Sequence, residues 1–87
     1  MTSAEKTAPF FANLDVALRK IPGWRERVKY LETQVGVWTD YHAQLFAWTN
    51  RPAGSEVPHP FNDELNSFNI EYVVARLRKM IAEEKEL

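Results

Sequence analysis

The sequence predicts an all-α fold, a three-helix bundle in which a short first helix packs on a long antiparallel pair. Apolar residues recur at spacings of three and four along most of the chain, and they do not alternate with period two as in a strand. Most of the five prolines and three glycines gather at two breaks in the 87 residues. These breaks, Pro22-Gly23 and a Pro-rich loop over residues 51–61, divide the chain into three helical segments.

The first helix is expected over residues 8–21, after a polar tail over residues 1–7. Thr7 is the expected N-cap, because its hydroxyl can accept a hydrogen bond from a free backbone N–H. Pro9 then falls in the first turn, where its missing N–H does little harm. Apolar residues follow at helical spacing, namely Phe10 or Phe11, Leu14, Ala17 or Leu18, and Ile21.

The second helix is expected over residues 22–50, a stretch whose apolar residues recur at alternating spacings of four and three. This main seam consists of Trp24, Val28, Leu31, Val35, Trp38, His42, Leu45 and Thr49. A second row lies about 80–100° around the helix from the first, since each residue turns the helix by about 100°. That row consists of Tyr30, Val37, Tyr41 and Trp48.

The third helix is expected over residues 62–85, with Asn62 as N-cap and the acids Asp63 and Glu64 favouring the helix dipole in the first turn. One apolar stripe occupies its N-terminal half and consists of Phe61, Leu65, Phe68, Tyr72 and Ala75. A second stripe lies mainly in its C-terminal half and consists of Ile70, Val73, Val74, Leu77, Met80 and Ile81. We expect Trp38 and Leu45 to meet Phe68 and Tyr72 in the core.

A row on the second helix is the expected partner interface, and it consists of Val37, Tyr41, Gln44 and Trp48. The first helix spans only about 21 Å at 1.5 Å per residue and is tied to the opposite end of the pair, so it cannot cover this row. Exposed aromatic rows are typical of interfaces. In the alternative interpretation, the Pro-rich loop folds back and buries the row with Val57 and Phe61.

Eight of the eleven basic residues are expected at one end of the bundle, where they form a possible patch for an anion or an acidic partner. They are Arg19, Lys20, Arg25, Arg27, Lys29, Arg76, Arg78 and Lys79. Because Glu26, Glu83, Glu84 and Glu86 are expected at the same end, an internally salt-bridged surface is the simpler interpretation.

The residue types give no support for catalysis, a cofactor or a metal site. The chain has no cysteine, which excludes thiolate chemistry, and no expected helix pairs a histidine with a second His or a carboxylate at ligand spacing. We expect His42 to be a hydrogen-bonded core residue and His59 a solvent-exposed loop residue. There is no phosphate-binding Gly-rich loop or nucleophile elbow.

These observations predict a non-catalytic protein–protein interaction module, an adaptor, assembly factor or accessory subunit that binds a protein partner or a second copy of itself. A net charge of −1 does not favour nucleic acid as a partner. No apolar run is long enough for a membrane span, and a cytoplasmic location is expected. The alternatives are a nucleic-acid-binding regulator that uses the basic end and a small dimeric helical enzyme with a site between chains.

Overall fold

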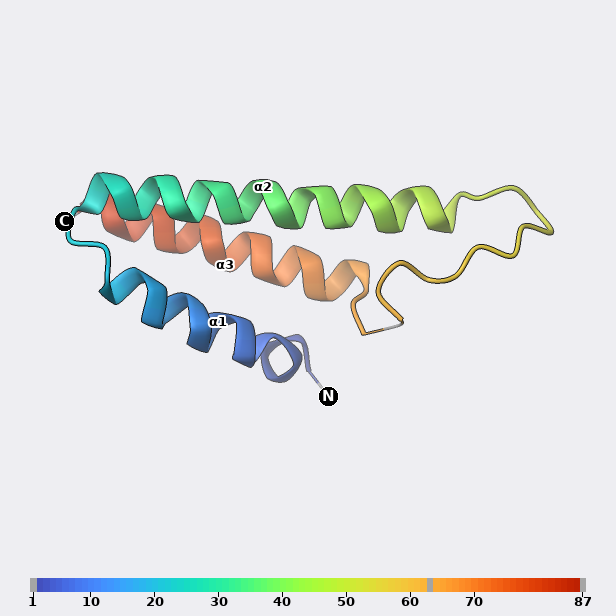
Figure 1. Cartoon of the computed structure of the whole chain (residues 1–87), viewed down its shortest axis with the longest axis horizontal. Coiled ribbons are helices and arrows are strands. Elements are labelled where there is room, and N and C mark those ends of the chain that lie inside the picture. The colour runs from blue at the N-terminus through green and yellow to red at the C-terminus, as the bar shows by residue number, and fades with distance from the viewer. Residues whose placement is uncertain (1, 63, 87) are drawn as a thin grey trace.

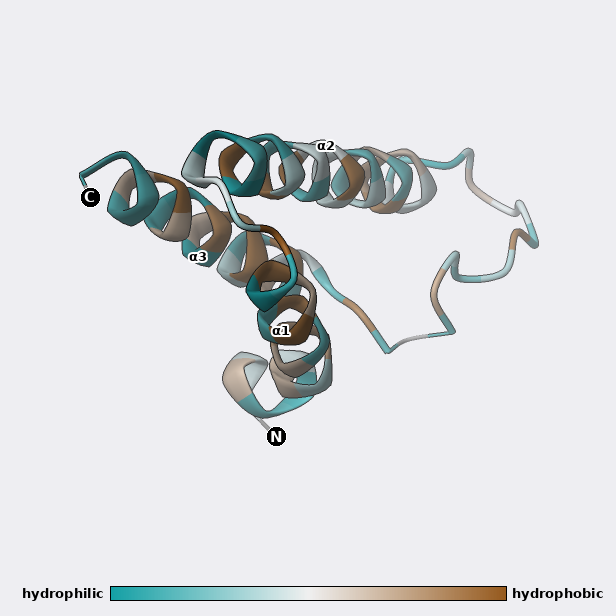
Figure 2. Cartoon of the chain, turned by 60° about the vertical axis from the view of Figure 1, so that its left-hand side comes forward, coloured by the Kyte–Doolittle hydropathy of each residue, from teal (hydrophilic) through white to brown (hydrophobic). Residues whose placement is uncertain are grey.

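The computed structural model describes residues 2–62 and 64–86, which form three helices, α1 (Ser3–Arg19), α2 (Trp24–Thr49) and α3 (Ser67–Glu86). No strand occurs within these ranges, and the predicted all-α class with three helices is confirmed. Figure 1 shows α3 running back alongside α2, with α1 on one side of this pair and a long loop beyond the end of α2. In Figure 2, apolar and polar residues alternate around all three helices, which are therefore amphipathic.

Helix α1 begins at Ser3, and the prediction that residues 1–7 form a tail ended by an N-cap at Thr7 is wrong. The Thr2 hydroxyl accepts a hydrogen bond from the backbone N–H of Glu5 at 3.2 Å, so Thr2 is the cap. Thr7 is a buried residue within α1, and its hydroxyl donates to the carbonyl oxygen of Ser3 at 2.6 Å. Ser3 also donates to the Asn69 side chain at 2.6 Å, and this contact holds the first turn of α1 against α3.

Helix α3 begins at Ser67 rather than at residue 62. Asn62 has a φ of 53°, which is the left-handed conformation of a turn and not the extended conformation of an N-cap. Asn66 caps the helix instead, because its side-chain oxygen accepts from the backbone N–H of Asn69 at 2.9 Å. The expected first-turn acid Asp63 lies outside the described residues, and Glu64 precedes the helix.

The buried core runs between all three helices. Its apolar side chains are Phe11 and Leu14 from α1, Leu31, Trp38 and Leu45 from α2, and Ile70, Val73 and Leu77 from α3. The contacts of α1 with the pair include the ring of Phe10 against Trp38 at 5.0 Å and the ring of Phe11 against Tyr72 at 6.3 Å. Helix α1 therefore covers the side of the α2–α3 pair to which Trp38 and Tyr72 belong.

Phe68 does not belong to the core, and this expectation is wrong. Its side chain is 75% exposed. At about 100° per residue, Phe68 lies about 160° around α3 from Ile70, which is fully buried. The stripe predicted for the N-terminal half of the third helix required a helix from residue 62, so the later start removes Phe61 and Leu65 from it.

The three helices make an elongated molecule. Its principal extents are 51 × 23 × 18 Å and its radius of gyration is 15.1 Å, whereas a compact domain of this length would have a radius of gyration of about 12 Å. An elongated shape exposes more surface per residue than a compact one. The long sides of the α2–α3 pair are consequently the main surfaces on which a binding site could lie.

The substitution Leu45→Ala tests the predicted core of the pair. Leu45 is buried between the helices, and loss of its side chain should lower the free energy of unfolding by about 2–5 kcal/mol. Chemical denaturation followed by circular dichroism measures this change. The control Val16→Ala alters a side chain that is 49% exposed on α1 and should stay within about 0.5 kcal/mol of the wild type. Equal effects of the two substitutions would contradict this core.

Candidate functional site

The row expected to meet a partner lies along α2 toward the loop. Val37, Tyr41 and Trp48 are half-buried, and Gln44 is exposed. The ring of Tyr41 packs edge-on against Trp38 at 5.3 Å and against Phe61 at 5.3 Å. Tyr41 is therefore covered from within the same chain, by a residue of the segment that joins α2 to α3.

Trp48 is also held by that segment. Its indole N–H donates to the carbonyl oxygen of Val57 at 2.8 Å, and its ring lies 4.7 Å from the ring of His59. The guanidinium of Arg51 stacks over the same indole at 4.1 Å, a favourable cation–π geometry. These contacts agree with the alternative interpretation, in which the loop folds back on the row. Val57 contributes its carbonyl, while its side chain remains exposed.

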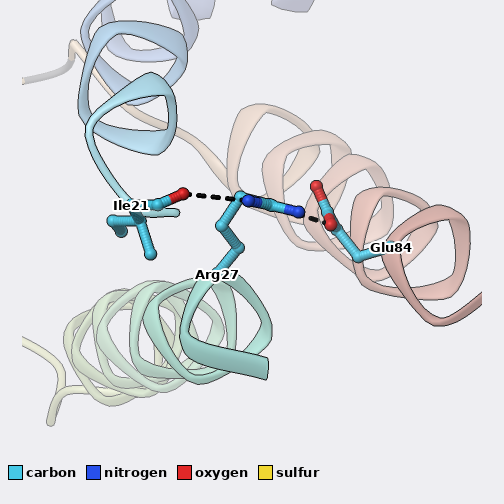
Figure 3. A network of polar contacts seen from close by, with 3 residues as sticks. All are labelled: Ile21, Arg27 and Glu84. Carbon is cyan, nitrogen blue, oxygen red and sulfur yellow. Dashed lines mark hydrogen bonds and ion pairs between the residues drawn. The ribbon is translucent and has the colours of Figure 1, made fainter. Parts of the chain in front are cut away.

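Arg27 is the basic residue that joins the three helices at their common end. Figure 3 shows its side chain between the carbonyl of Ile21 and the carboxylate of Glu84. The guanidinium donates to the Ile21 oxygen at 2.9 Å through Nη1 and to the Glu84 Oε2 at 3.0 Å through Nε. One planar cation thus ties the connection between α1 and α2 to the last turns of α3, which is a structural role.

The remaining bases of the expected patch are divided among several surfaces. Arg19 lines a cavity with Arg27 and the acids Asp15 and Glu84. Arg76 and Lys79 line another with Glu83. Arg76 also stacks over the ring of Phe11 at 4.2 Å. Arg78 lies on a different side of α3.

Three further bases of the patch, Lys20, Arg25 and Lys29, are exposed, and Arg25 lies over the ring of its neighbour Trp24 at 5.3 Å. Acids accompany the bases in both the cavity lined by Arg19 and the cavity lined by Arg76. The eight residues therefore do not make a continuous positive surface.

A groove lies between α2 and α3, and we call it the open groove. It has a volume of about 310 Å³ and is lined by Thr39, His42, Ile70, Glu71, Val74, Ala75 and Arg78. Tyr72 and Arg76, which contact Phe11 of α1, lie on nearly the opposite side of α3 at about 100° per residue. The open groove is thus on the side of the pair that α1 does not cover.

Two large aromatic residues outside the lining of the open groove are exposed, one on each helix. Phe46 is 66% exposed on α2 and lies four residues after His42, so both occupy one face of the helix. Phe68 lies seven residues before Ala75 on α3 and shares its face. The sequence pattern predicted Phe68 as a core residue. Its angular position relative to Ile70 is the signal that could have located it.

The two histidines are not where the sequence predicts. The His42 side chain is 40% exposed at the rim of the open groove, and its Nε2 lies 3.8 Å from Oε1 of Glu71, so it is not a core residue. His59 is half-buried rather than solvent-exposed, and its Nδ1 accepts from the backbone N–H of Phe61 at 3.0 Å. Nothing in the spacing of the chain revealed these partners, because they depend on the loop and on the helix pairing.

Within residues 2–62 and 64–86, no group of three or more His, Asp or Glu side chains could hold a metal ion. The helices in the same ranges include none that is long and apolar enough to span a membrane. Comparisons of the chain with protein-family models, with curated proteins and with solved structures find no match.

Docking of the loop through Trp48 can be tested with Trp48→Phe. This change keeps an aromatic ring but removes the N–H that Val57 accepts, a hydrogen bond worth about 0.5–1.5 kcal/mol. Amide hydrogen exchange in residues 51–61 should accelerate about two- to tenfold, as followed by mass spectrometry. Trp24→Phe is the matched control and should leave exchange in the loop unchanged. Unaltered loop exchange in Trp48→Phe would show that the indole does not anchor the loop.

Proposed function

We propose that this protein is a non-catalytic protein–protein interaction module that associates through the open groove and the two aromatics beside it. The observation that supports this proposal is the exposure of Phe46 and Phe68, at 66% and 75%, on the two helices that form an apolar groove. Large aromatic side chains that pack into a partner account for much of the binding energy of protein interfaces. A self-sufficient monomer has little reason to expose two of them on neighbouring helices.

The site proposed from the sequence, with Tyr41 and Trp48 at its centre, is less suited to a partner. Phe61 already packs against Tyr41, and the backbone carbonyl of Val57 already accepts the indole N–H of Trp48. A partner at this row would first have to displace the loop, whereas the open groove needs no rearrangement. Association therefore remains our proposed function, and the proposed interface lies on the other side of α2 from Tyr41 and Trp48.

The residues of the open groove favour binding over catalysis. Its titratable pair, His42 and Glu71, is open to water, with side chains 40% and 66% exposed. An acid–base pair works best in a site that excludes water and fixes its geometry. In this groove the same two polar groups are better suited to orienting a bound helix or peptide.

The double substitution Phe46→Ser and Phe68→Ser tests the proposal. Both side chains are exposed, so the helical fold should be retained, with each change within about 0.5 kcal/mol. We expect at least a tenfold loss of associated protein, on the order of 1.4 kcal/mol or more. Affinity purification from the native source with quantitative mass spectrometry, together with sedimentation of the purified protein, measures it.

Val16→Ser is the matched control, because Val16 is an exposed apolar residue on the outer surface of α1. It should associate like the wild type. If the double variant keeps every association of the wild type, the groove is not the interface.

Nucleic acid binding, the runner-up function, predicts a different result. Because the bases do not form a continuous surface, duplex and single-stranded DNA should bind more weakly than about 1 µM at roughly 150 mM salt. A fluorescence titration at several salt concentrations measures the affinity. Tighter binding that persists at this salt concentration would favour the nucleic-acid function.

A further inference from the structure

The groove side of α3 carries a row of residues that is complementary to itself when the helix is reversed. From the N-terminal end the row consists of Ser67, Glu71, Val74 with Ala75, Arg78 and Ala82. Its order is small, acidic, apolar, basic and small. The apolar centre and both charges line the open groove. Turning the helix end over end about Val74 and Ala75 exchanges the position of the acid with that of the base.

Within one chain these two charges do not meet. Glu71 and Arg78 are seven residues apart, about 10.5 Å along the helix axis, on the same face. The contact that the structure shows for the Glu71 carboxylate is with His42 across the groove, 3.8 Å from Oε1 to Nε2. Among the described residues, the Arg78 side chain forms no hydrogen bond or ion pair. Both charges are thus available to a partner in the groove.

We propose that the occupant of the open groove is a second copy of this chain, with its α3 antiparallel to the first and Glu71 of each copy paired with Arg78 of the other. The proposal rests on the proposed function and specifies its partner. A two-fold axis through the level of Val74 and Ala75 brings both pairs into register at once. Such an isologous contact needs a surface that is complementary to itself, and the row on α3 has this property.

The sequence itself favours α3 as the occupant over the other helices. An antiparallel helix that complements Glu71 and Arg78 must present an acid followed seven residues later by a base. Of the twelve Asp and Glu residues in the chain, Glu71 alone has a Lys or Arg seven positions after it. Neither α1 nor α2 carries such a pair.

The shape of the groove also suits a second α3. Ala75 at the centre and Ala82 near one end are small, which lets two helix backbones approach closely. Phe46 lies at the level of Ser67, because the contact between His42 and Glu71 sets the alignment of the two helices. In the antiparallel pair this level is occupied by Ala82 of the second copy. The exposed Phe46 ring therefore meets a small residue rather than a bulky one.

Charge exchange tests the proposal directly. In Glu71→Arg, each Arg78 faces an arginine of the other copy, and in Arg78→Glu, each Glu71 faces a glutamate. Since symmetry converts two attractive contacts into two repulsive ones, each single variant should dimerise at least about tenfold more weakly than the wild type. Analytical ultracentrifugation over a concentration series measures the dissociation constants.

Two further samples distinguish a direct pairing from a general effect of charge. The double variant Glu71→Arg with Arg78→Glu restores both pairs and should regain the wild-type dimer. An equimolar mixture of the two single variants should form a heterodimer at least about tenfold tighter than either homodimer. Lys79→Glu is the control on α3, because Lys79 lines the cavity with Tyr72 and Arg76 on the side toward α1. It should not change the dissociation constant.

The outcomes separate this proposal from the proposed function. Circular dichroism of each single variant shows whether it retains the helices. A wild type that sediments as a monomer up to about 1 mM associates too weakly for a specific dimer, and this result overturns the second copy as occupant. Loss of other associated proteins in the Phe46 and Phe68 variant would then still support the open groove as an interface. A dimer whose single variants are not rescued by mixing also overturns the proposed pairing.

Discussion

The structure depends on one geometric constraint, which is that a pair of long helices has two sides and the described part of the chain has a single further helix with which to cover them. Helix α2 has 26 residues and α3 has 20, so the pair extends over about 30–39 Å. Helix α1, with 17 residues, packs against one side through Phe11 and Leu14. The opposite side keeps its groove, and the end of α2 extends beyond the start of α3.

The chain covers the projecting end of α2 with its own loop. The interaction is local and combines one hydrogen bond from Trp48, the rings of His59 and Phe61, and the guanidinium of Arg51. Prolines on either side of His59 restrict the unfolded loop, so less conformational entropy is lost when it docks. An aromatic row that resembles an interface in the sequence thus has contacts within the chain, and the open groove, which we propose as the interface, lies on the other side of α2.

Helical periodicity predicted the fold class and most of the core, but not the ends of the helices. Leu31, Trp38, Leu45, Val73 and Leu77 follow from spacing alone, since burial of a helix face repeats every three or four residues. The start of α3 depends on whether Asn62 or Asn66 caps it. Asparagine suits an N-cap at either position. Asn66 is the cap because the loop holds Asn62 in a left-handed turn.

The start of α1 was misjudged for a related reason. Pro9 favours the first turn of a helix, yet α1 continues through it. The earlier residues gain a long-range contact, from Ser3 to Asn69, that no local pattern contains. The sequence did not reveal the open groove, because the groove depends on how α2 and α3 pair.

The charges beside the groove matter because apolar burial has no direction. Val74, Ala75 and Phe46 would accept a helix in either orientation, and an unprotected apolar groove would bind many partners. A second α3 in parallel register would place Glu71 against Glu71 and Arg78 against Arg78, which is unfavourable at both positions. The antiparallel register replaces both repulsions with ion pairs. Glu71 and Arg78 thus favour one helix in one orientation, whereas the apolar residues of the groove alone favour burial against any apolar partner.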